Sequence, residues 1–401
     1  MSARAASAAC AAPAATAGWA GILAGVLALF VALPPLTVRS DALVVVLGAL
    51  ALAAGAAALR GGERKLGGAA ILAGLLGAGL GYGAAHTATG GLEAAVSWGA
   101  LGGATLRFAC PLIFAALGGL VSERSGVVNI ALEGMMLMGA FFAAYGADKT
   151  GSWVLGILIG MLAGAALAAV HAVFAISVRS DQIVSGTALN FVALGLTGYM
   201  YVDVYGADGT PNDLPQVPEV HLPTSSLGFA GNSIDDQNLL VWVSLVMVVA
   251  VWVFVFRTRA GLRMRSVGEN PRAAETVGIS VQRTRYLAVI ASGALAALGG
   301  AFLSIGSVHS FTQNMTAGKG FIALAALIFG RWRPFGLLAA TLLFGFSSAL
   351  AQRLPQLTPG AENVATLLQA LPYVLTLVAV AGVIGRSIPP KADGVPYKRE
   401  G

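Results

Sequence analysis

Two polar residues stand four positions apart inside a long apolar stretch. In SERSGVVNIALEGMMLMG (residues 122–139), Asn129 and Glu133 have this spacing, which predicts that both lie on one face of a helix. A carboxyl group in such an environment is costly unless it faces water, a partner or a broken helix. Glu133 therefore has three interpretations: a proton-coupling carboxylate, a substrate contact, or an acceptor for backbone amides at a broken helix. We favour the structural role.

Other polar side chains in apolar segments are weaker candidates for chemistry. Asn190, His171 and Gln182 are of types that most often hydrogen-bond between helices in lipid. The chain has no G-x-x-x-x-G-K-[ST] motif, since Gly318-Lys319-Gly320 lacks that spacing, and it has no H-E-x-x-H motif. We therefore expect no catalytic residue, no metal site and no cofactor bound by this chain.

A basic stretch carries the sharpest local signal. Residues 257–285 read RTRAGLRMRSVGENPRAAETVGISVQRTR, in which Asn270 can cap a helix that begins at Pro271. Arg272–Val277 then forms barely two turns before Gly278 ends them. Arginines alone are typical of loops that contact anionic lipid. A short helix of small residues between two glycine breaks instead predicts a docking element for a cytosolic partner.

The composition defines the elements that must position these residues. Only 10% of the residues are charged and 57% are hydrophobic, whereas soluble domains carry about 25% charged residues. Apolar segments recur at Gly18–Leu36, Ala42–Leu59, Leu66–Ala85, Ala94–Val121, Val127–Tyr145, Ser152–Ser177, Ile183–Val202, Asn238–Phe256, Tyr286–Gly306, Met315–Gly330, Phe335–Ala351 and Leu367–Gly385. Because a membrane span needs about 20 apolar residues, the sequence predicts an all-α polytopic membrane protein with about 10–12 transmembrane helices.

Two of these segments are irregular. Ala94–Val121 is overlong and contains Arg107 and Pro111, while Met315–Gly330 is short and contains Lys319. We expect broken or re-entrant helices at both places, because irregular backbone is tolerated in a membrane where it lines a cavity.

The distribution of charge predicts the orientation. With residues 257–285 in the cytoplasm, most of the 24 basic residues fall on the same side, as the positive-inside rule expects. Both termini are then cytoplasmic, and residues 1–17 are expected to be a disordered tail. The Pro- and Asp-rich loop 203–237 falls outside, either as a solvated connector or as a landing surface for a partner. The net charge of +6 thus reflects topology, and we expect no nucleic-acid partner.

Three segments resemble a known family. They are LGGLVSERSGVVNIALEGMMLMGAF (residues 117–141), GLRMRSVGENPRAAETVGI (residues 261–279) and GKGFIALAALIFGRWRPFG (residues 318–336). They resemble the inner-membrane permeases of ABC importers for branched-chain amino acids, ribose-type sugars and nucleosides, and most closely the nucleoside (simple-sugar-like) permeases. The resemblance covers roughly residues 106–397, the expected permease core. Residues 18–105 form an extra N-terminal transmembrane region without a counterpart in the shorter nucleoside permeases.

The resemblance implies a type II ABC importer permease fold and a place in the bacterial cytoplasmic membrane. It implies a pathway subunit for nucleosides, with ATP and Mg bound by a separate ABC ATPase subunit. A second homologous permease would complete a heterodimer, and an extracytoplasmic lipoprotein would deliver the substrate. The alternatives are a ribose-type sugar, a branched-chain amino acid, or a different class of protein, an ion-coupled secondary transporter. The last would be expected to show more intramembrane acids than Glu133.

The resemblance also places the candidate sites. Residues 267–278 match the coupling element that enters a groove on the ATPase. The coupling residues expected there are Gly268, Glu269, Asn270, Pro271, Ala273, Ala274, Glu275 and Gly278. The residues expected along the substrate pathway are Asn129, Glu133, Asn190, Lys319 and Phe321. All but Asn190 lie in segments that match pathway segments of the family.

Overall fold

The computed structural model divides the chain into two compact units, with the first boundary between Leu101 and Gly102. The residues that it describes are 14, 16–25, 27–28, 41–86, 98–206, 209–211, 214–222, 231, 233–357 and 388–398. The first unit contains helices α2 and α3. The second contains residues 102–352 and 388–398, and with them both candidate sites.

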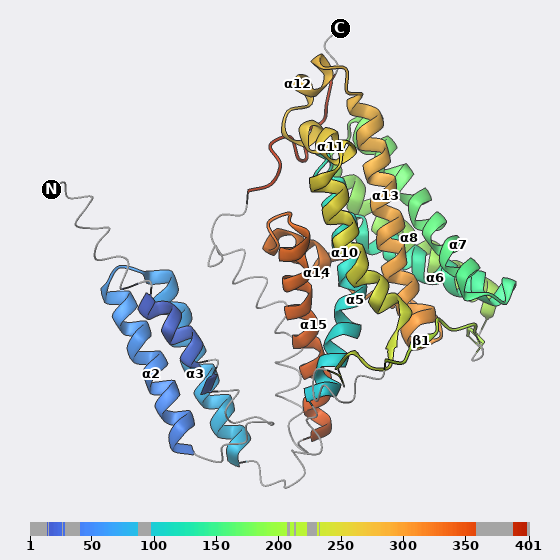
Figure 1. Ribbon diagram of the computed structural model, residues 1–401. Helices are drawn as coiled ribbons and strands as arrows, with labels where there is room; N and C mark the ends of the chain where they lie inside the picture. The colour runs from blue at the N-terminus through green and yellow to red at the C-terminus, as the bar shows by residue number, and fades with distance from the viewer. Residues whose placement is uncertain are drawn as a thin grey trace. The chain divides into compact units, whose positions relative to one another are not determined.

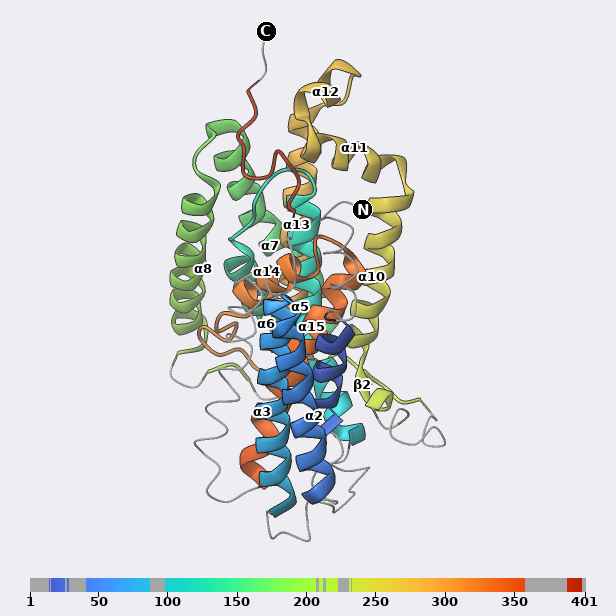
Figure 2. The same cartoon turned by 90° about the vertical axis from the view of Figure 1, so that its left-hand side faces the viewer.

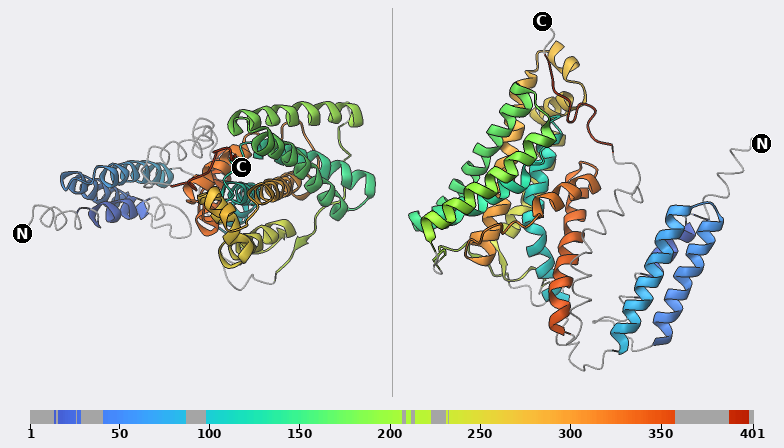
Figure 3. Two further views of the ribbon diagram at one scale, coloured as in Figure 1. Left: turned by 90° about the horizontal axis from the view of Figure 1, so that it is seen from above. Right: turned by 180° about the vertical axis from the view of Figure 1, so that it is seen from behind.

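The described part of the first unit centres on a helical hairpin. Helix α2 (Asp41–Arg60) and helix α3 (Arg64–His86) lie side by side (Figures 1 and 3). The tight turn between them contains Gly62, which has a φ of +88°. The helices touch through small residues: a Cβ atom on Gly67 would lie 2.7 Å from the Gly55 carbonyl oxygen. Close packing through glycine is the usual way in which helices associate in lipid.

The second unit is a helical bundle. Its helices are α5 (Trp98–Glu123), α6 (Leu132–Thr150), α7 (Trp153–Ala172), α8 (Gln182–Tyr205), α10 (Leu239–Arg257), α11 (Arg259–Glu269), α12 (Pro271–Thr276), α13 (Val281–Ala301), α14 (Lys319–Phe329) and α15 (Pro334–Leu357). The π-helical turns η1 (Val173–Val178) and η3 (Phe302–Val308) extend α7 and α13. The strands β1 (Glu219–Val220) and β2 (Gln237–Asn238) form one short antiparallel pair.

Helices α6, α7 and α13 pack closely on one another in this bundle (Figure 1). Glycines let their backbones approach directly. A Cβ atom on Gly139 of α6 would lie 2.3 Å from the Ala297 carbonyl oxygen of α13, and one on Gly164 of α7 would lie 2.7 Å from that of Gly293. The abundance of glycine in the sequence thus has the packing role expected of a membrane bundle.

The bundle has two chemically different ends. Helices α11 and α12 lie at one end of α13, and the β1–β2 pair lies at the other (Figures 1 and 2). Asn238 fixes the second end: its side-chain amide donates to the carbonyl oxygens of Val217 and Gly306, and its side-chain oxygen accepts from the Leu240 amide at the start of α10. We call the end that carries α11 and α12 the basic end.

Seven helices among the described residues are long and apolar enough to cross a membrane. They span 42–60, 99–123, 153–178, 182–205, 239–257, 281–308 and 334–353. The chain is therefore a multi-pass membrane protein and belongs to the predicted all-α class. The span predicted at residues 367–385 lies outside the described residues, and so do residues 26 and 29–36 of the span predicted at 18–36.

The two irregular segments had different outcomes. The predicted break near Arg107 and Pro111 is wrong, because α5 runs unbroken from Trp98 to Glu123 with Pro111 inside it. Neighbouring helices can compensate the amide that proline lacks. The prediction for Met315–Gly330, a helix too short to cross the membrane, is confirmed. Helix α14 has 11 residues, which is about 16 Å at 1.5 Å per residue and so about half of the ~30 Å hydrocarbon core.

Candidate functional site

Glu133 holds the N-terminus of the half-length helix α14. Its carboxylate accepts hydrogen bonds from the backbone amides of Gly318, at 2.8 Å, and Gly320, at 2.6 Å. The side chain is buried. A carboxylate at a helix N-terminus is stabilised by the unpaired amides and by the helix dipole. The geometry is that of the structural interpretation of Glu133, an acceptor for backbone amides at a broken helix.

The glycines around Lys319 make this contact possible. Gly318 has a φ of +84°, a left-handed conformation that glycine adopts without strain. Gly320 lies against Glu133 so closely that a Cβ atom would be 2.5 Å from the Glu133 amide nitrogen. Lys319 itself turns back and donates to the carbonyl oxygens of Met315 and Thr316, while Phe321 is 47% exposed.

Asn129 does not share a helix with Glu133, so that prediction was wrong. Helix α5 ends at Glu123 and α6 begins at Leu132, and residues 124–131 between them are not helical. We call these residues the buried linker. Asn129 lies within it, with its side-chain amide donating to the Ser292 hydroxyl at 2.8 Å and its oxygen accepting from the Ala131 amide. The physical reason is that Asn129 can hydrogen-bond its own backbone two residues on, which competes with helix.

The backbone of the buried linker is bonded by side chains from α7 and α8. Gln182 accepts from the Val128 amide at 2.8 Å, and His171 bonds the Val128 carbonyl oxygen at 3.0 Å. Asn190 donates to the Ile130 carbonyl oxygen and accepts from the Gly134 amide, at 3.0 and 2.8 Å. A buried backbone without helix needs such partners. These three polar residues thus support a segment that the helical interpretation of the sequence did not include.

The buried linker also contacts the turn after α14. Arg124 donates two hydrogen bonds to the Trp332 carbonyl oxygen, at 2.6 and 3.1 Å, and the Trp332 indole donates to the Glu123 carboxylate at 2.5 Å. Glu123 and Arg124 are adjacent, and Glu133 is only nine residues beyond Arg124. Both ends of α14 are therefore held from the region between the end of α5 and the start of α6.

The short helix at the basic end has the predicted form. Helix α12 runs from Pro271 to Thr276, and the Asn270 side chain accepts from the Ala273 amide at 3.1 Å. Pro271 occupies the first turn, and Gly278 has a φ of +83° that ends the element. The sequence did not predict the preceding helix α11, whose N-terminus is capped by Thr258.

The eight expected coupling residues divide into two groups. Glu269, Asn270, Ala273 and Gly278 are exposed, and Pro271 is partly exposed. Gly268 and Ala274 are buried, and Ala274 packs in a small cluster with Val267 and Val281. Glu275 is partly buried and accepts a hydrogen bond from the Tyr397 hydroxyl. Gly268, Ala274 and Glu275 therefore position α12 within this chain, and the exposed residues form the face available to a partner.

A groove of about 940 Å³ lies beside α12. Its walls are mostly apolar and come from the ends of α10, α11 and α13, with Phe254, Met264 and Leu287 among them. Arg263 and Arg283 add two exposed positive charges. The groove adjoins residues 277–280 directly, so the exposed face of α12 continues into a concave, amphipathic surface.

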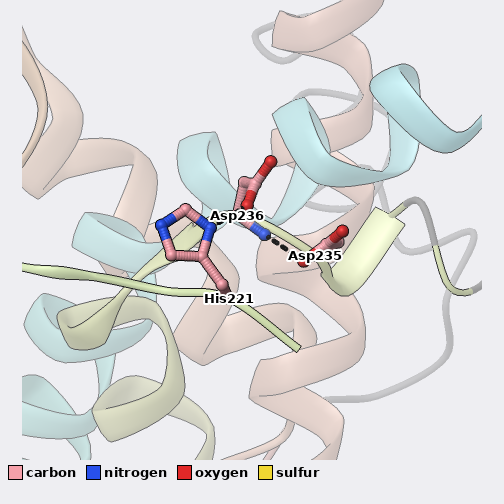
Figure 4. A group of neighbouring side chains, drawn as sticks. All are labelled: His221, Asp235 and Asp236. Atoms are coloured by element: carbon pink, nitrogen blue, oxygen red, sulfur yellow. Dashed lines mark hydrogen bonds and ion pairs between the residues drawn. The ribbon is translucent and has the colours of Figure 1, made fainter. Parts of the chain in front are cut away.

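At the opposite end, among the residues that the structure describes, three side chains of metal-ligand type lie close together. His221, Asp235 and Asp236 bring their possible ligand atoms within 4.8 Å of one another (Figure 4). His221 and Asp236 hydrogen-bond each other, and Asp235 accepts from the amides of Leu222 and Asp236. The Asp236 carboxylate raises the pKa of the exposed His221 imidazole. These bonds close the β1–β2 hairpin, which accounts for the group without an ion.

Residues near the C-terminus were missed by the sequence analysis. Residues 388–398 lie against α11, α12 and the start of α13, through contacts of Ala392, Val395 and Tyr397. Arg285 contacts residues 388–398, whereas the sequence pattern indicates for it only a place in the basic stretch 257–285 that sets the orientation. Its side chain is 1% exposed, and nothing local in the sequence distinguishes it from its exposed neighbour Arg283.

Comparison with known proteins identifies relatives of the second unit. Residues 102–380 match the family model described as branched-chain amino acid transport system / permease component. The chain is 42% identical to the guanosine ABC transporter permease protein NupQ of Bacillus subtilis, over 69% of this chain and 89% of that protein. It is 41% identical to the nucleoside ABC transporter permease protein NupC of Lactococcus lactis, with the same coverage.

A third relative has a different named substrate. The chain is 37% identical to the putative glucose ABC transporter permease protein TsgC13 of Haloferax volcanii, over 65% of this chain and 79% of that protein. No solved structure matches the chain. Helices α2 and α3 lie before residue 102, outside the match to the family model.

Proposed function

The chain belongs to the branched-chain amino acid transport system permease component family, and from this premise we propose that it forms the membrane pathway of an ATP-driven nucleoside importer. The observation that carries the proposal is the identity of 41–42% to permeases named for guanosine and nucleosides, over 89% of their length. The chain is then a pathway subunit, with ATP and Mg bound by a partner ATPase.

Helix α12 is the proposed contact with that ATPase. It lies at the basic end, is capped at Asn270, and presents Ala273 to solvent beside the exposed Glu269 at the end of α11. The adjoining groove offers apolar walls and the charges of Arg263 and Arg283. Since the positive-inside rule places a basic end in the cytoplasm, we propose that this end and both termini are cytoplasmic.

Two further partners complete the proposed transporter. A second, homologous permease would form the other half of the pathway as a heterodimer. An extracytoplasmic binding lipoprotein would dock at the opposite end, where residues 203–237 leave α8 and return to α10. The support for both is the resemblance of this chain to importer permeases. The relatives named above are all ABC transporter permeases, which also disfavours the ion-coupled carrier that the sequence left open.

Within the membrane, we propose that the start of α14 borders the pathway. Glu133 occupies the amides of Gly318 and Gly320, so these donors are bound within the chain rather than to substrate. The exposed ring of Phe321 lies directly beyond them. In this proposal Glu133 and Asn190 shape the pathway, while Phe321 and Lys319 lie nearer to the substrate.

A sugar is the second candidate substrate, because of the 37% identity to a putative glucose permease. Uptake separates the two candidates. Cells with and without the gene are given radiolabelled guanosine, uridine or glucose at equal concentrations. We expect gene-dependent uptake of guanosine that excess unlabelled uridine or adenosine reduces and excess glucose does not. Gene-dependent uptake of glucose alone would contradict the nucleoside proposal and support the sugar.

Coupling through α12 has its own test. Glu269→Trp places a bulky ring on the exposed approach to α12 without disturbing its buried side. We expect it to abolish ATP hydrolysis stimulated by guanosine and its binding protein in the reconstituted transporter. Normal stimulation in this variant would remove α12 from the coupling role.

A further inference from the structure

The C-terminal residues 388–398 are bound to the element that contains α12. The Ala392 amide donates to the Gly268 carbonyl oxygen at 2.9 Å, at the end of α11. The Tyr397 hydroxyl donates to the Glu275 carboxylate. The Tyr397 ring packs against the cluster that contains Ala274, the buried residue of α12. Contacts from more than 100 residues downstream therefore hold the inner side of α12.

One buried arginine joins this C-terminal segment to the buried linker. The Arg285 guanidinium donates to the carbonyl oxygens of Ser125, at 3.2 Å, Val395, at 3.0 Å, and Ala392, at 3.5 Å. A guanidinium group offers five N–H donors in a fixed plane, so it can bind several carbonyl groups at once. Burying this charge is costly without such partners. Arg285 thus connects α13, the buried linker and the C-terminal segment.

Helix α11, the buried linker and the C-terminal segment also pack closely against one another. A Cβ atom on Gly268 would lie 2.3 Å from the Arg124 carbonyl oxygen. A Cβ atom on Gly126 would lie 2.8 Å from the Arg285 guanidinium and 3.1 Å from the Ala392 carbonyl oxygen. Gly268 thus lies directly against the Arg124 backbone, and Gly126 against the backbone of Ala392. Closely packed elements transmit displacement rather than absorb it.

The buried linker continues from this contact to the start of α14. Ser125 accepts a hydrogen bond from Arg285, and Gly126 lies close to the Arg285 guanidinium and the Ala392 carbonyl group. Seven residues beyond Gly126 the chain reaches Glu133. Glu133 holds the amides of Gly318 and Gly320. A continuous series of hydrogen bonds and backbone contacts thus runs from α12 to α14.

We propose that Arg285 and residues 388–398 form a clasp that makes α12 and the buried linker move as one body. The clasp carries the displacement of α12 to α14, so the C-terminal segment serves coupling rather than attachment of the ATPase. This inference rests on the proposed function, in which α12 is the contact with a cytosolic ATPase. Arg285 acts as a positioning residue, because its bonds are to backbone groups of this chain.

The test uses the complete transporter reconstituted in lipid nanodiscs, with ATPase, second permease and binding protein. Guanosine is the probe. The wild-type complex must first show guanosine-stimulated ATP hydrolysis, and its absence would count against the proposed function rather than against the clasp. The variants are a deletion of residues 388–401 and Arg285→Gln. Their matched controls are a deletion of residues 399–401, which spares the clasp, and Arg179→Gln, an exposed arginine that does not line the groove beside α12.

We expect stimulated hydrolysis to fall at least about fivefold in both clasp variants, the lower bound for loss of a typical coupling energy. The ATPase should copurify with both in the wild-type ratio, and both controls should behave as wild type. Arg285→Lys keeps the charge but not the planar fork, so we expect it to restore stimulation only in part.

Three results would overturn the clasp. The first is full stimulation after deletion of residues 388–401. The second is loss of ATPase copurification in that variant, which would make the segment a docking surface. The third is equal loss in Arg179→Gln, which would indicate a general effect of charge. If Arg285→Gln does not insert in the membrane, Tyr397→Ala decides, because it removes a clasp contact outside the membrane-spanning helices and should lower stimulation with assembly intact.

Discussion

Helices α12 and α14 are both short, and their N-termini are capped in opposite ways. Helix α12 is capped by Asn270, the residue directly before it, which bonds an amide three positions on. Helix α14 is capped by Glu133, which is 185 residues away in the sequence from Gly318. A local cap stabilises a helix wherever the helix moves. A distant cap ties the helix to another part of the fold.

This difference suits the two proposed roles. An element that docks on a partner must keep its shape while its surroundings shift. The local Asn270 cap suits α12 to this role, because the cap moves with the helix. An element that borders a pathway must stay in register with the helices around it, and α14 is bonded to the start of α6. The predictions below weaken each cap and compare the consequences.

The largest effect is expected from Gly320→Ala. The added Cβ atom would lie 2.5 Å from the Glu133 amide nitrogen, and backbone atoms cannot rotate away. Overpacking of this kind typically costs about 1–3 kcal/mol, and here it acts on the α14 cap itself. We expect guanosine uptake to fall about 10- to 100-fold at equal membrane abundance.

Gly198→Ala is the matched control, because nothing lies within 4 Å of its added Cβ atom. Wild-type uptake in Gly320→Ala would show that α14 need not lie against Glu133.

Glu133→Gln should have a smaller effect. The amide side chain keeps one acceptor oxygen but turns an N–H₂ group toward a backbone donor, and it loses the charge that strengthens both bonds. We expect guanosine uptake to fall about three- to tenfold, with no change in its pH dependence, because the carboxylate serves as a cap. Uptake at the normal rate would show that Glu133 is neither essential to the pathway nor proton-coupled. A lost pH dependence would instead support the proton-coupling interpretation.

Asn270→Ala tests the local cap. Removing an N-cap side chain costs about 0.5–2 kcal/mol, and the helix that loses it has six residues. We expect guanosine-stimulated ATP hydrolysis to fall about threefold, less than the loss of uptake in Gly320→Ala. Asn270→Asp keeps the cap and should retain wild-type stimulation. If Asn270→Ala had the larger effect, the distant cap would not be the more critical of the two.

The last prediction concerns the pH dependence of the C-terminal segment and not transport itself. Burial raises the pKa of Asp393 to about 7, while the Arg285 charge and a hydrogen bond from the Gly394 backbone oppose the rise. Its Oδ1 atom is buried without a hydrogen-bond partner among the described residues. Since the pKa in the bound segment is above the unfolded value of about 3.9, binding favours the protonated form. Attachment of residues 388–398 should therefore be strongest below about pH 4 and weaken up to about pH 7.

Hydrogen exchange of the Ala392 amide measures this attachment, because that amide bonds the Gly268 carbonyl oxygen. After correction for intrinsic exchange, protection should be about 30-fold greater at pH 5.5 than at pH 8. Asp393→Asn should remove the difference and keep high protection at both pH values. Protection that increases with pH in the wild-type protein would contradict the argument that protonated Asp393 favours attachment of residues 388–398.

The contrast between the caps also explains what the sequence could predict. The cap, first turn and end of α12 depend on Asn270, Pro271 and Gly278, which lie within nine residues, so local rules found them. The short length of α14 was visible in its apolar run. The pairing of Glu133 with Gly318 was not, because apolar patterning says which residues are buried and not which distant backbone they meet.

The errors have the same origin. Asn129 was placed on a helix because its neighbours are apolar, yet His171, Gln182 and Asn190 provide partners that let the linker remain non-helical. Pro111 was expected to break α5, yet the helix continues through it. Ala274 and Gly268 belonged to the matched coupling segment, but only the fold shows that they face inward. In each case tertiary contacts decided what local propensity left open.

The proposal that both caps serve ATP-driven transport is tested most directly by the energy source of uptake. Cells with and without the gene take up radiolabelled guanosine after an uncoupler has collapsed the proton gradient while ATP is kept high, and in parallel after ATP has been depleted. We predict gene-dependent uptake that persists with the uncoupler and disappears with ATP depletion. Uptake that collapses with the gradient while ATP stays high would contradict the account and identify an ion-coupled transporter.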